Sequence, residues 1–313
     1  MKTTVLVLAL SLCAALCHAQ VPDVVIQTRG SFLTGPDNGF CGEYLNLETS
    51  GKIADGFSYV FRQRFNVPVT TSDIFGATDK IYVQYNTGNW EFSVGKVVLE
   101  CGGYEFDAAP IDVFFAGDYW NHGSGFFNFA IAAARYFGTE RVCLQVGRSP
   151  LGTVALSGLY SLNLSARGTN GWYSHIWSAN IFGVEKGVQS FQQFLGNRFT
   201  FGFVTADVDI IHRLTLGAPT FFKDYSVVMN VNMAVSPWLH LFAKAAYDCN
   251  DTSTFALVPP GTDLLKVGGG IEAFPIKGSS DLRLHCLFYH DTRPILMTGL
   301  TFKFHLLRSK NES

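Results

Sequence analysis

The sequence has 313 residues, of which 48% are hydrophobic, 14% aromatic and only 15% charged, and its formal net charge is −2. In a usual protein about a quarter of the residues are charged. This chain has fewer, so it has either a very large core or an apolar exterior. No bulk positive charge points to nucleic acid. After the first twenty residues no apolar run approaches the roughly 18 residues of a membrane-spanning helix, which excludes a helical membrane protein.

The first 19 residues have the pattern of a secretory signal peptide. Lys2 precedes an apolar run from Val5 to Leu16, and small residues follow at the positions that a signal peptidase reads. Such segments are removed from the mature protein. We predict cleavage after Ala19 and export of the mature chain.

The mature chain consists of short runs in which apolar and polar residues alternate, separated by turn residues. This period of two is typical of half-buried strands. We predict sixteen strands, with fourteen as the alternative, near 24–33, 40–52, 57–65, 78–86, 90–99, 125–136, 140–148, 157–167, 171–182, 192–202, 203–212, 223–235, 239–248, 264–275, 281–290 and 295–307.

The connections between these runs are of two kinds. Tight turns follow every second strand, at 52–56, 86–89, 138–140, 168–171, 236–238 and 277–280. The other connections are mostly long, notably 100–124, 183–191 and 249–263. Short periplasmic turns at one end and long extracellular loops at the other are typical of outer-membrane barrels.

Alternation within single strands also favours a barrel. Phe57, Tyr59 and Phe61 share one face of a strand, while Arg62 and Arg64 share the other. A soluble β-sandwich would alternate as well, but its strands run about five or six residues, against the ten or so of tilted spanning strands. We therefore predict an all-β transmembrane antiparallel barrel over 20–307 in the cell outer membrane, with lipid-facing aromatics and a polar tail at 308–313.

The alternation also predicts which charged residues line the lumen. The acids on the inward face are Glu48, Glu91, Asp207, Asp209 and Glu272. The predicted pore-lining basic residues are Arg62, Arg64, Arg198, Lys244, Lys266, Arg283 and Lys303. A mixed wall with a mild basic excess steers anions weakly. Lys96 breaks the alternation, and we expect it at the rim or at a bulge.

The segment 100–124 is longer than ordinary connections and is therefore a functional candidate. It contains no lysine or arginine, and its acids are Glu100, Glu105, Asp107, Asp112 and Asp118. We expect it to fold into the barrel, set its acids opposite the wall arginines and narrow the pore. The alternative is an acidic outer loop in solvent, since charge runs are usually solvated.

Signals for catalysis, metals and disulfides are weak. His122 and Ser124 have the spacing of a histidine and a serine on one strand face, but no orienting group or oxyanion site accompanies them. The histidines show no ligand cluster, so we expect neither metal nor cofactor. Five cysteines remain after cleavage, an odd number, and a Cys41 to Cys101 bridge stays open as an alternative.

Several stretches together resemble the outer-membrane family of phosphate-selective porins O and P, in its Bacteroides-type branch. They are GFSYVFRQRFN (56–66), VGKVVLECGGYEFDAAPIDVFF (94–115), GNRFTFG (196–202), FFKDYSVV (221–228), LFAKAAYD (241–248) and PGTDLLKVGGGIEAFPIKG (260–278). The resemblance implies a sixteen-stranded barrel, often a homotrimer, that passes small solutes. Phosphate-selective members carry a dense arginine ladder and a lysine cluster at the mouth, which this sequence lacks, so phosphate as the solute rests on the resemblance alone.

The sequence leads to three hypotheses of function. The leading hypothesis is a porin for passive diffusion of small polar or ionic solutes, weakly anion-preferring, with phosphate among the candidate anions and outer-membrane lipid as its surroundings. The second is an outer-membrane hydrolase that uses His122 and Ser124. The third is a plugged barrel that serves as a structural or secretion-complex component.

Overall fold

A computed structural model describes residues 21–35, 38–67, 75–117, 119, 126–151, 159–185, 187–217, 223–251 and 261–308. The described residues form sixteen strands. They are β1 (Asp23–Thr34), β2 (Gly39–Ala54), β3 (Phe57–Arg64), β4 (Thr78–Thr87), β5 (Trp90–Val98), β6 (Phe127–Phe137), β7 (Glu140–Arg148), β8 (Tyr160–Asn170), β9 (Tyr173–Glu185), β10 (Val188–Phe201), β11 (Val204–Thr215), β12 (Asp224–Ser236), β13 (Leu239–Asn250), β14 (Thr262–Ala273), β15 (Leu282–His290) and β16 (Pro294–Leu307).

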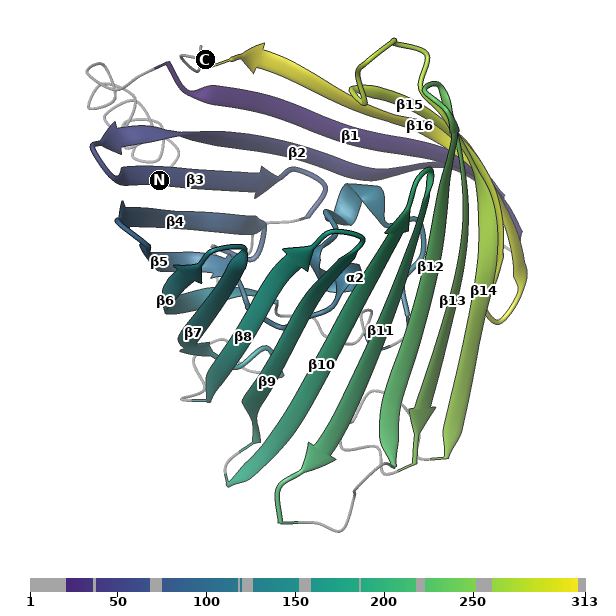
Figure 1. The fold of residues 1–313 in the computed structure, drawn as a ribbon. Helices are drawn as coiled ribbons and strands as arrows, with labels where there is room; N and C mark the ends of the chain where they lie inside the picture. Colours follow the sequence, from purple (N-terminus) through teal and green to yellow (C-terminus); the bar gives the residue numbers. More distant parts are fainter. Residues whose placement is uncertain are drawn as a thin grey trace.

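The sixteen strands form one closed antiparallel barrel (Figure 1). Each strand pairs with the next along the chain, and β1 pairs with β16 to close the sheet, with Val24 opposite Leu307. Closure leaves no unpaired sheet edge, which is the condition for a sheet that meets lipid. The predicted sixteen-stranded barrel is confirmed, and the alternatives of fourteen strands and of a two-sheet sandwich are wrong.

The predicted strand ends agree with the structure to within a few residues, apart from one connection. The long loop predicted over 183–191 is wrong, because β9 extends to Glu185 and β10 begins at Val188, with Glu185 opposite Val188 in the register. The cluster of charged and glycine residues there resembles a loop in sequence. Gly187 has a φ of 82°, which a tight turn needs and glycine adopts at little cost.

Apolar residues cover the outside of the barrel and polar residues are buried inside it. Ile131 is 67% exposed and Phe288 54%, whereas Gln145 and Asn163 are 1% and 0% exposed. In β3, Phe57 is exposed while Arg62 is buried, as the alternation predicts. A soluble protein buries apolar residues and exposes polar ones, so this inverted arrangement identifies the outer face as a lipid-facing surface.

The wall is lower on one side of the barrel than on the other. Strands β3 to β7 have 8 to 11 residues, whereas β9 to β13 have 12 to 14. The connections after even-numbered strands have two residues each, apart from the eight after β14. β1 begins and β16 ends at the same barrel end as these turns. Among the described residues, no helix is long and apolar enough to cross a membrane.

Candidate functional site: the constriction inside the barrel

The chain between β5 and β6 leaves the wall and enters the barrel (Figure 1). We call its described residues 99–117 and 119 the inward segment. It contains the short helix α2 (Tyr104–Asp107) and the 3₁₀ helix η2 (Pro110–Asp112). Its polar groups contact wall strands far apart in sequence, and these contacts fix its position in the lumen.

The first anchor joins α2 to β10 and β11. The Asp209 carboxylate accepts hydrogen bonds from the backbone N–H of Tyr104 (2.9 Å) and of Glu105 (2.7 Å). Beside it, a Cβ added at Gly196 would lie 2.6 Å from Gly103 Cα. Only glycine at 196 allows the two backbones to approach this closely, so Asp209 and Gly196 together seat α2 on the wall.

The second anchor is a buried ion pair between β13 and α2. Lys244 Nζ of β13 lies 2.7 Å from Glu105 Oε1 and donates to the Phe115 carbonyl at 2.7 Å. Glu105 also accepts from the Gly117 N–H at 2.9 Å. Both charged side chains are nearly inaccessible to solvent. Removing one partner of a buried pair strongly destabilises a protein, so Lys244 holds α2 against this part of the wall.

The third anchor binds η2 to the wall near β1 and β15. Arg29 Nη1 donates to the carbonyls of Ile111 and Val113, each at 2.9 Å. Arg283 forms ion pairs with Asp112 and, at 3.3 Å, with Glu272. The Arg29 guanidinium satisfies two backbone carbonyls of the inward segment, since buried carbonyls need a donor, and Arg283 holds the Asp112 carboxylate.

An apolar cluster packs beneath α2. The Phe106 ring contacts the rings of Phe126 and Phe194 with centroid distances of 4.7 and 5.3 Å, and Leu99 and Cys101 are buried in the same cluster. Burial raises the pKa of Tyr104 to about 12 and also raises the pKa of the Cys101 thiol. Both groups are therefore neutral near pH 7 and add no charge to the lumen.

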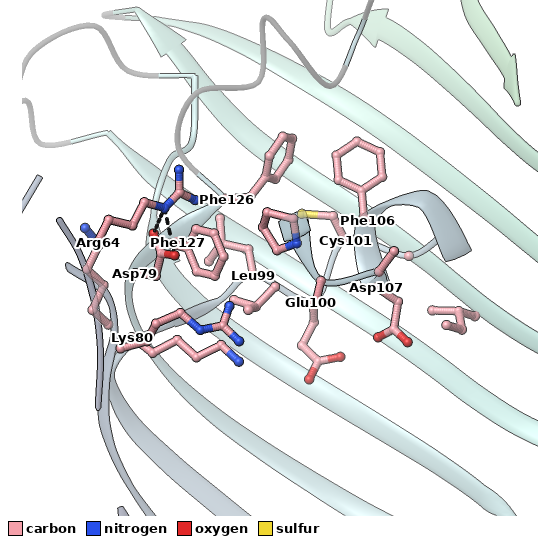
Figure 2. A pocket seen from close by; sticks show the side chains of 18 of the residues that line it. Arg64, Asp79, Lys80, Leu99, Glu100, Cys101, Phe106, Asp107, Phe126 and Phe127 are labelled. Atoms are coloured by element: carbon pink, nitrogen blue, oxygen red, sulfur yellow. Dashed lines mark hydrogen bonds and ion pairs between the residues drawn. The ribbon is translucent and has the colours of Figure 1, made fainter. Parts of the chain in front are cut away.

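On the side of β3 to β5, the inward segment leaves a cavity of about 530 Å³ open (Figure 2). Five basic and three acidic side chains line it. The basic ones are Arg62, Arg64, Lys80, Lys96 and Arg167, and the acidic ones are Asp79, Glu100 and Asp107. A smaller cavity of about 260 Å³ lies on the opposite side of the segment, toward β11 to β15. A third cavity, of about 560 Å³, is lined by Glu91 and Arg141 and shares Glu100 and Arg167 with the first. We call the cavity of about 530 Å³, which lies between the inward segment and β3 to β5, the constriction.

The wall arginines of this constriction have carboxylate partners. Arg62 Nε lies 2.6 Å from Glu48, and Arg64 Nε lies 2.8 Å from Asp79. Lys80, by contrast, forms no ion pair with any residue that the structure describes. It shares the inward face of β4 with Tyr82, opposite the exposed Ile81. Lys80 therefore differs from Arg62 and Arg64, its neighbours at the constriction, in having no ion-pair carboxylate among the described residues.

The other predicted basic residues lie away from this cavity. Arg198 pairs with Asp207 at 2.6 Å, and Lys244 and Arg283 hold the inward segment. Lys266 lies 3.4 Å from Asp291 near the loop end. Lys303 lies on β16 opposite Gln27, toward the end with the short turns. The structure thus brings only two of the seven, Arg62 and Arg64, to the constriction.

The predicted loop acids separate in a similar way. Glu100 and Asp107 line the constriction, where Arg167 contacts them at 3.7 and 3.1 Å, and Glu100 also contacts Arg141 at 3.0 Å. Glu105 and Asp112 are anchors on the far side. Asp118 lies outside the described residues, as do His122 and Ser124.

The sequence reasoning missed several charged residues of the lumen. They are Arg29, Lys80, Arg141, Arg167, Glu43 and Asp79. Strict alternation from a neighbouring inward residue would have found most of them, since Arg167 follows Ser161, Asn163 and Ser165 on one face of β8. The missed residues weaken the prediction of a basic excess on the wall, because most of them form ion pairs with each other or with the predicted acids.

Lys96 reaches the rim rather than a bulge. Its Nζ donates to the Phe75 carbonyl in the β3–β4 connection at 2.7 Å, and the β4–β5 register runs through Lys96 without a shift.

Cys41 is an exposed thiol and Cys101 a buried one, so the Cys41 to Cys101 bridge is not formed. Within the described part of the chain, no group of three or more histidine, cysteine or acidic residues is arranged to hold a metal.

Comparisons with solved structures agree on the fold. OmpF of Salmonella typhi in complex with daunomycin aligns with a TM-score of 0.66 at 7% identity, covering 90% of this chain and 97% of that one. The trimer form of OmpT, an outer-membrane protein of Vibrio cholerae, aligns at 0.62 and 13%, covering 90% and 99%. A triple mutant of the Rhodopseudomonas blastica porin aligns at 0.57 and 13%, covering 90% and 99%. No family model and no curated protein matches the sequence.

The chain therefore has a porin-like fold, an outer-membrane β-barrel. Together with the apolar exterior, this fold supports the predicted localisation in an outer membrane. Membership of the phosphate-selective branch stays a prediction, as do the signal peptide and the function of the individual lumen residues.

Proposed function

We propose that this protein is a porin through which small polar and ionic solutes diffuse passively across an outer membrane, with a weak preference for anions. The observation that supports this most directly is the charged constriction. A closed barrel with a lipid-compatible exterior encloses a cavity of about 530 Å³, lined by five basic and three acidic residues, between β3 to β5 and the inward segment. Rings of charged side chains are what select ions in such pores.

The preference for anions that we propose is weak because most wall charges are neutralised nearby. Arg62 and Arg64 each contact an acid within 2.8 Å, which leaves Lys80 as the main surplus charge. A phosphate dianion would need several cations at one place. We therefore propose small anions in general as permeant ions, with phosphate as one of them rather than as the specific solute.

Single-channel recording tests this proposal. The mature protein is refolded in detergent and added to a planar bilayer under a KCl gradient. We expect discrete conductance steps and a reversal potential displaced modestly toward that of chloride. Replacing both Arg62 and Arg64 with alanine leaves Glu48 and Asp79 without partners, so the reversal potential should move toward that of potassium. A silent bilayer that contains correctly inserted barrels would contradict the open pore and favour the plugged, partner-holding barrel.

We further propose a homotrimer. One structural neighbour is described as a trimer form, and the low wall of β3 to β7 carries exposed apolar residues such as Phe92 and Ile131 that a second copy could cover. The mass of the protein in detergent, measured by light scattering with the detergent contribution subtracted, distinguishes a trimer from a monomer; the full 313-residue chain has a mass of 34.4 kDa.

A further inference from the structure

The outer face of the low wall is hollowed between β5 and β7. The hollow has a volume of about 560 Å³, and almost all the side chains that line it are apolar. Its floor includes Ala133 of β6, which the register places directly between Phe92 of β5 and Leu144 of β7. Both of these larger neighbours are exposed on the outer face. A methyl group between two large side chains leaves the surface open, and we call this hollow the outer groove.

An arginine lies next to the outer groove, on the side of the short turns. Arg135 shares the outer face of β6 with Ala133 and lies opposite Trp90 of β5. Its guanidinium carbon is 5.3 Å from the centre of the Trp90 ring and 4.9 Å from the centre of the Phe137 ring. A guanidinium that stacks on aromatic faces keeps its N–H donors available for a planar or tetrahedral oxyanion. The two rings therefore hold this cation at the level of the aromatic belt, where lipid head groups begin.

No carboxylate that the structure describes pairs with Arg135. The nearby acids of β5 and β7 are engaged elsewhere. Glu91 pairs with Arg141 inside the barrel at 2.7 Å, and Glu140 pairs with His175 of β9 at 3.2 Å. A cation on a lipid-facing surface is unfavourable unless an anion accompanies it, so the counter-ion of Arg135 must come from the membrane.

The groove and the arginine together define a ligand that neither would select alone. In a bilayer every apolar surface meets acyl chains, and the driving force for choosing one of them is small. Arginine, however, donates two parallel N–H bonds to a phosphate. Arg135 follows Ala133 by two residues, about 7 Å along the strand, so a lipid phosphate on Arg135 brings its own acyl chain beside the groove.

We propose that this surface binds one anionic phospholipid, with its phosphate on Arg135 beside Trp90 and Phe137 and one acyl chain in the outer groove over Ala133. The site lies outside the lumen, so this inference goes beyond the proposed porin function and does not depend on it. In the proposed homotrimer the same strands face a second copy, and the bound lipid fills the hollow that the two surfaces would otherwise leave between them.

Native mass spectrometry of the refolded protein, titrated with lipid in detergent, tests the site. Phosphatidylglycerol is anionic, whereas phosphatidylcholine with the same acyl chains has an ammonium group that compensates its phosphate. We expect one saturable phosphatidylglycerol adduct per chain, with an apparent Kd about fivefold lower than that of phosphatidylcholine, as one partly exposed charge contact would give.

The first variant tests the phosphate contact. Arg135→Gln should remove the preference, so that the two lipids bind equally. Arg308→Gln is the matched control, because it removes a guanidinium group at the same end of the barrel but beside Asp281, away from β5 to β7. Its preference for phosphatidylglycerol should equal that of the unaltered protein.

The second variant tests the groove. Ala133→Phe fills the hollow between Phe92 and Leu144 and should weaken the binding of both lipids several-fold without changing the ratio between them. Ala243→Phe makes the same change on the exposed outer face of β13 and should leave both affinities unchanged. Arg135 and Ala133 face away from the lumen, so both variants should keep the single-channel conductance of the unaltered protein.

Each outcome decides for or against the lipid site. Equal affinities of the unaltered protein for the two lipids, or equal effects of Arg135→Gln and Arg308→Gln, would overturn the phosphate contact. Lipid binding that Ala133→Phe leaves intact would overturn the groove, and a trimer that carries no lipid would show that a second copy covers this surface directly. A silent bilayer would overturn the porin alone, whereas an open channel without the lipid adduct would overturn this site alone.

Discussion

Two sides of the lumen use the same kinds of residue in opposite ways. Toward β10 to β15, Lys244, Arg198 and Arg283 each pair with an acid at 3.3 Å or less, and two of these pairs hold the inward segment. Toward β3 to β5, the segment leaves a cavity of about 530 Å³, where Lys80 has no ion-pair partner among the described residues. We call these the anchored side and the open side.

The difference teaches that an inward charge is not by itself a pore charge. A cation in contact with a carboxylate produces little field beyond the pair, and on the anchored side Lys244 also donates to the backbone of the inward segment. The same side chain on the open side faces solvent and a passing solute. Function therefore depends on where the inward segment lies.

The largest expected effect comes from breaking the anchored side. Lys244→Met leaves Glu105 buried without its ion-pair partner, which should cost about 3–5 kcal/mol of stability, and should free the inward segment. We expect single-channel conductance to rise about twofold and the urea midpoint of unfolding to fall. The double variant Glu105→Gln with Lys244→Met removes the unpaired charge and should recover part of the midpoint. Unchanged conductance and an unchanged midpoint in the single variant would show that the pair is not an anchor.

A second substitution tests the close approach of the two backbones on the anchored side. Gly196→Val places side-chain atoms where Gly103 lies, since even a Cβ would come within 2.6 Å of Gly103 Cα. Overpacking of this kind costs about 1–3 kcal/mol, so we expect a lower urea midpoint and a higher conductance. Gly42→Ala is the matched control, because a Cβ at Gly42 meets nothing within 4 Å. Equal effects of the two substitutions would argue against the contact.

Ion selectivity tests the open side. Lys80→Gln should lower the chloride-to-potassium permeability ratio about twofold, which corresponds to about 0.4 kcal/mol, while Lys303→Gln should leave the ratio unchanged. The measurement is the reversal potential under a KCl gradient. Equal shifts in the two variants would mean that charge anywhere in the lumen sets selectivity and that the open side has no special role.

The smallest expected effect lies outside both sides, at the turn between β14 and β15. A hydrogen bond with Ser279, together with His305 and Arg308 nearby, lowers the pKa of Asp281. A lowered pKa means that the carboxylate stabilises the fold above its ordinary pKa of 3.8 and that this contribution is lost as the pH falls below it. Asp281→Asn should lower the free energy of unfolding by about 0.5 kcal/mol or less at pH 7 and by almost nothing at pH 3. A difference that grows on acidification would reverse the sign and refute this account.

The sequence predicted the wall better than the lumen. In β3 a period of two separates Phe57 from Arg62, and every neighbouring strand must keep the same register, so the faces follow from the residues alone. The predicted loop over 183–191 was wrong because Gly187 allows a tight turn there, although the charged residues around it are typical of a loop. Lys80 could have been found by counting the alternation, since it shares a face of β4 with Tyr82 and Gln84. Asp79 could not, because the β3–β4 register shifts at this residue.

The sequence by itself determined the barrel and which strand faces point inward. It indicated the number of strands, the lipid-facing aromatics, the inward arginines and the irregular acidic segment at 100–124. These are local properties, fixed by a period of two and by turn residues. What only the tertiary structure decided is which charges meet. Glu105 contacts Lys244 and Asp112 contacts Arg283 across more than a hundred residues of chain, whereas Lys80 forms no ion pair with any residue that the structure describes. Such contacts depend on how the closed barrel places the inward segment in three dimensions, and no spacing along the chain encodes them.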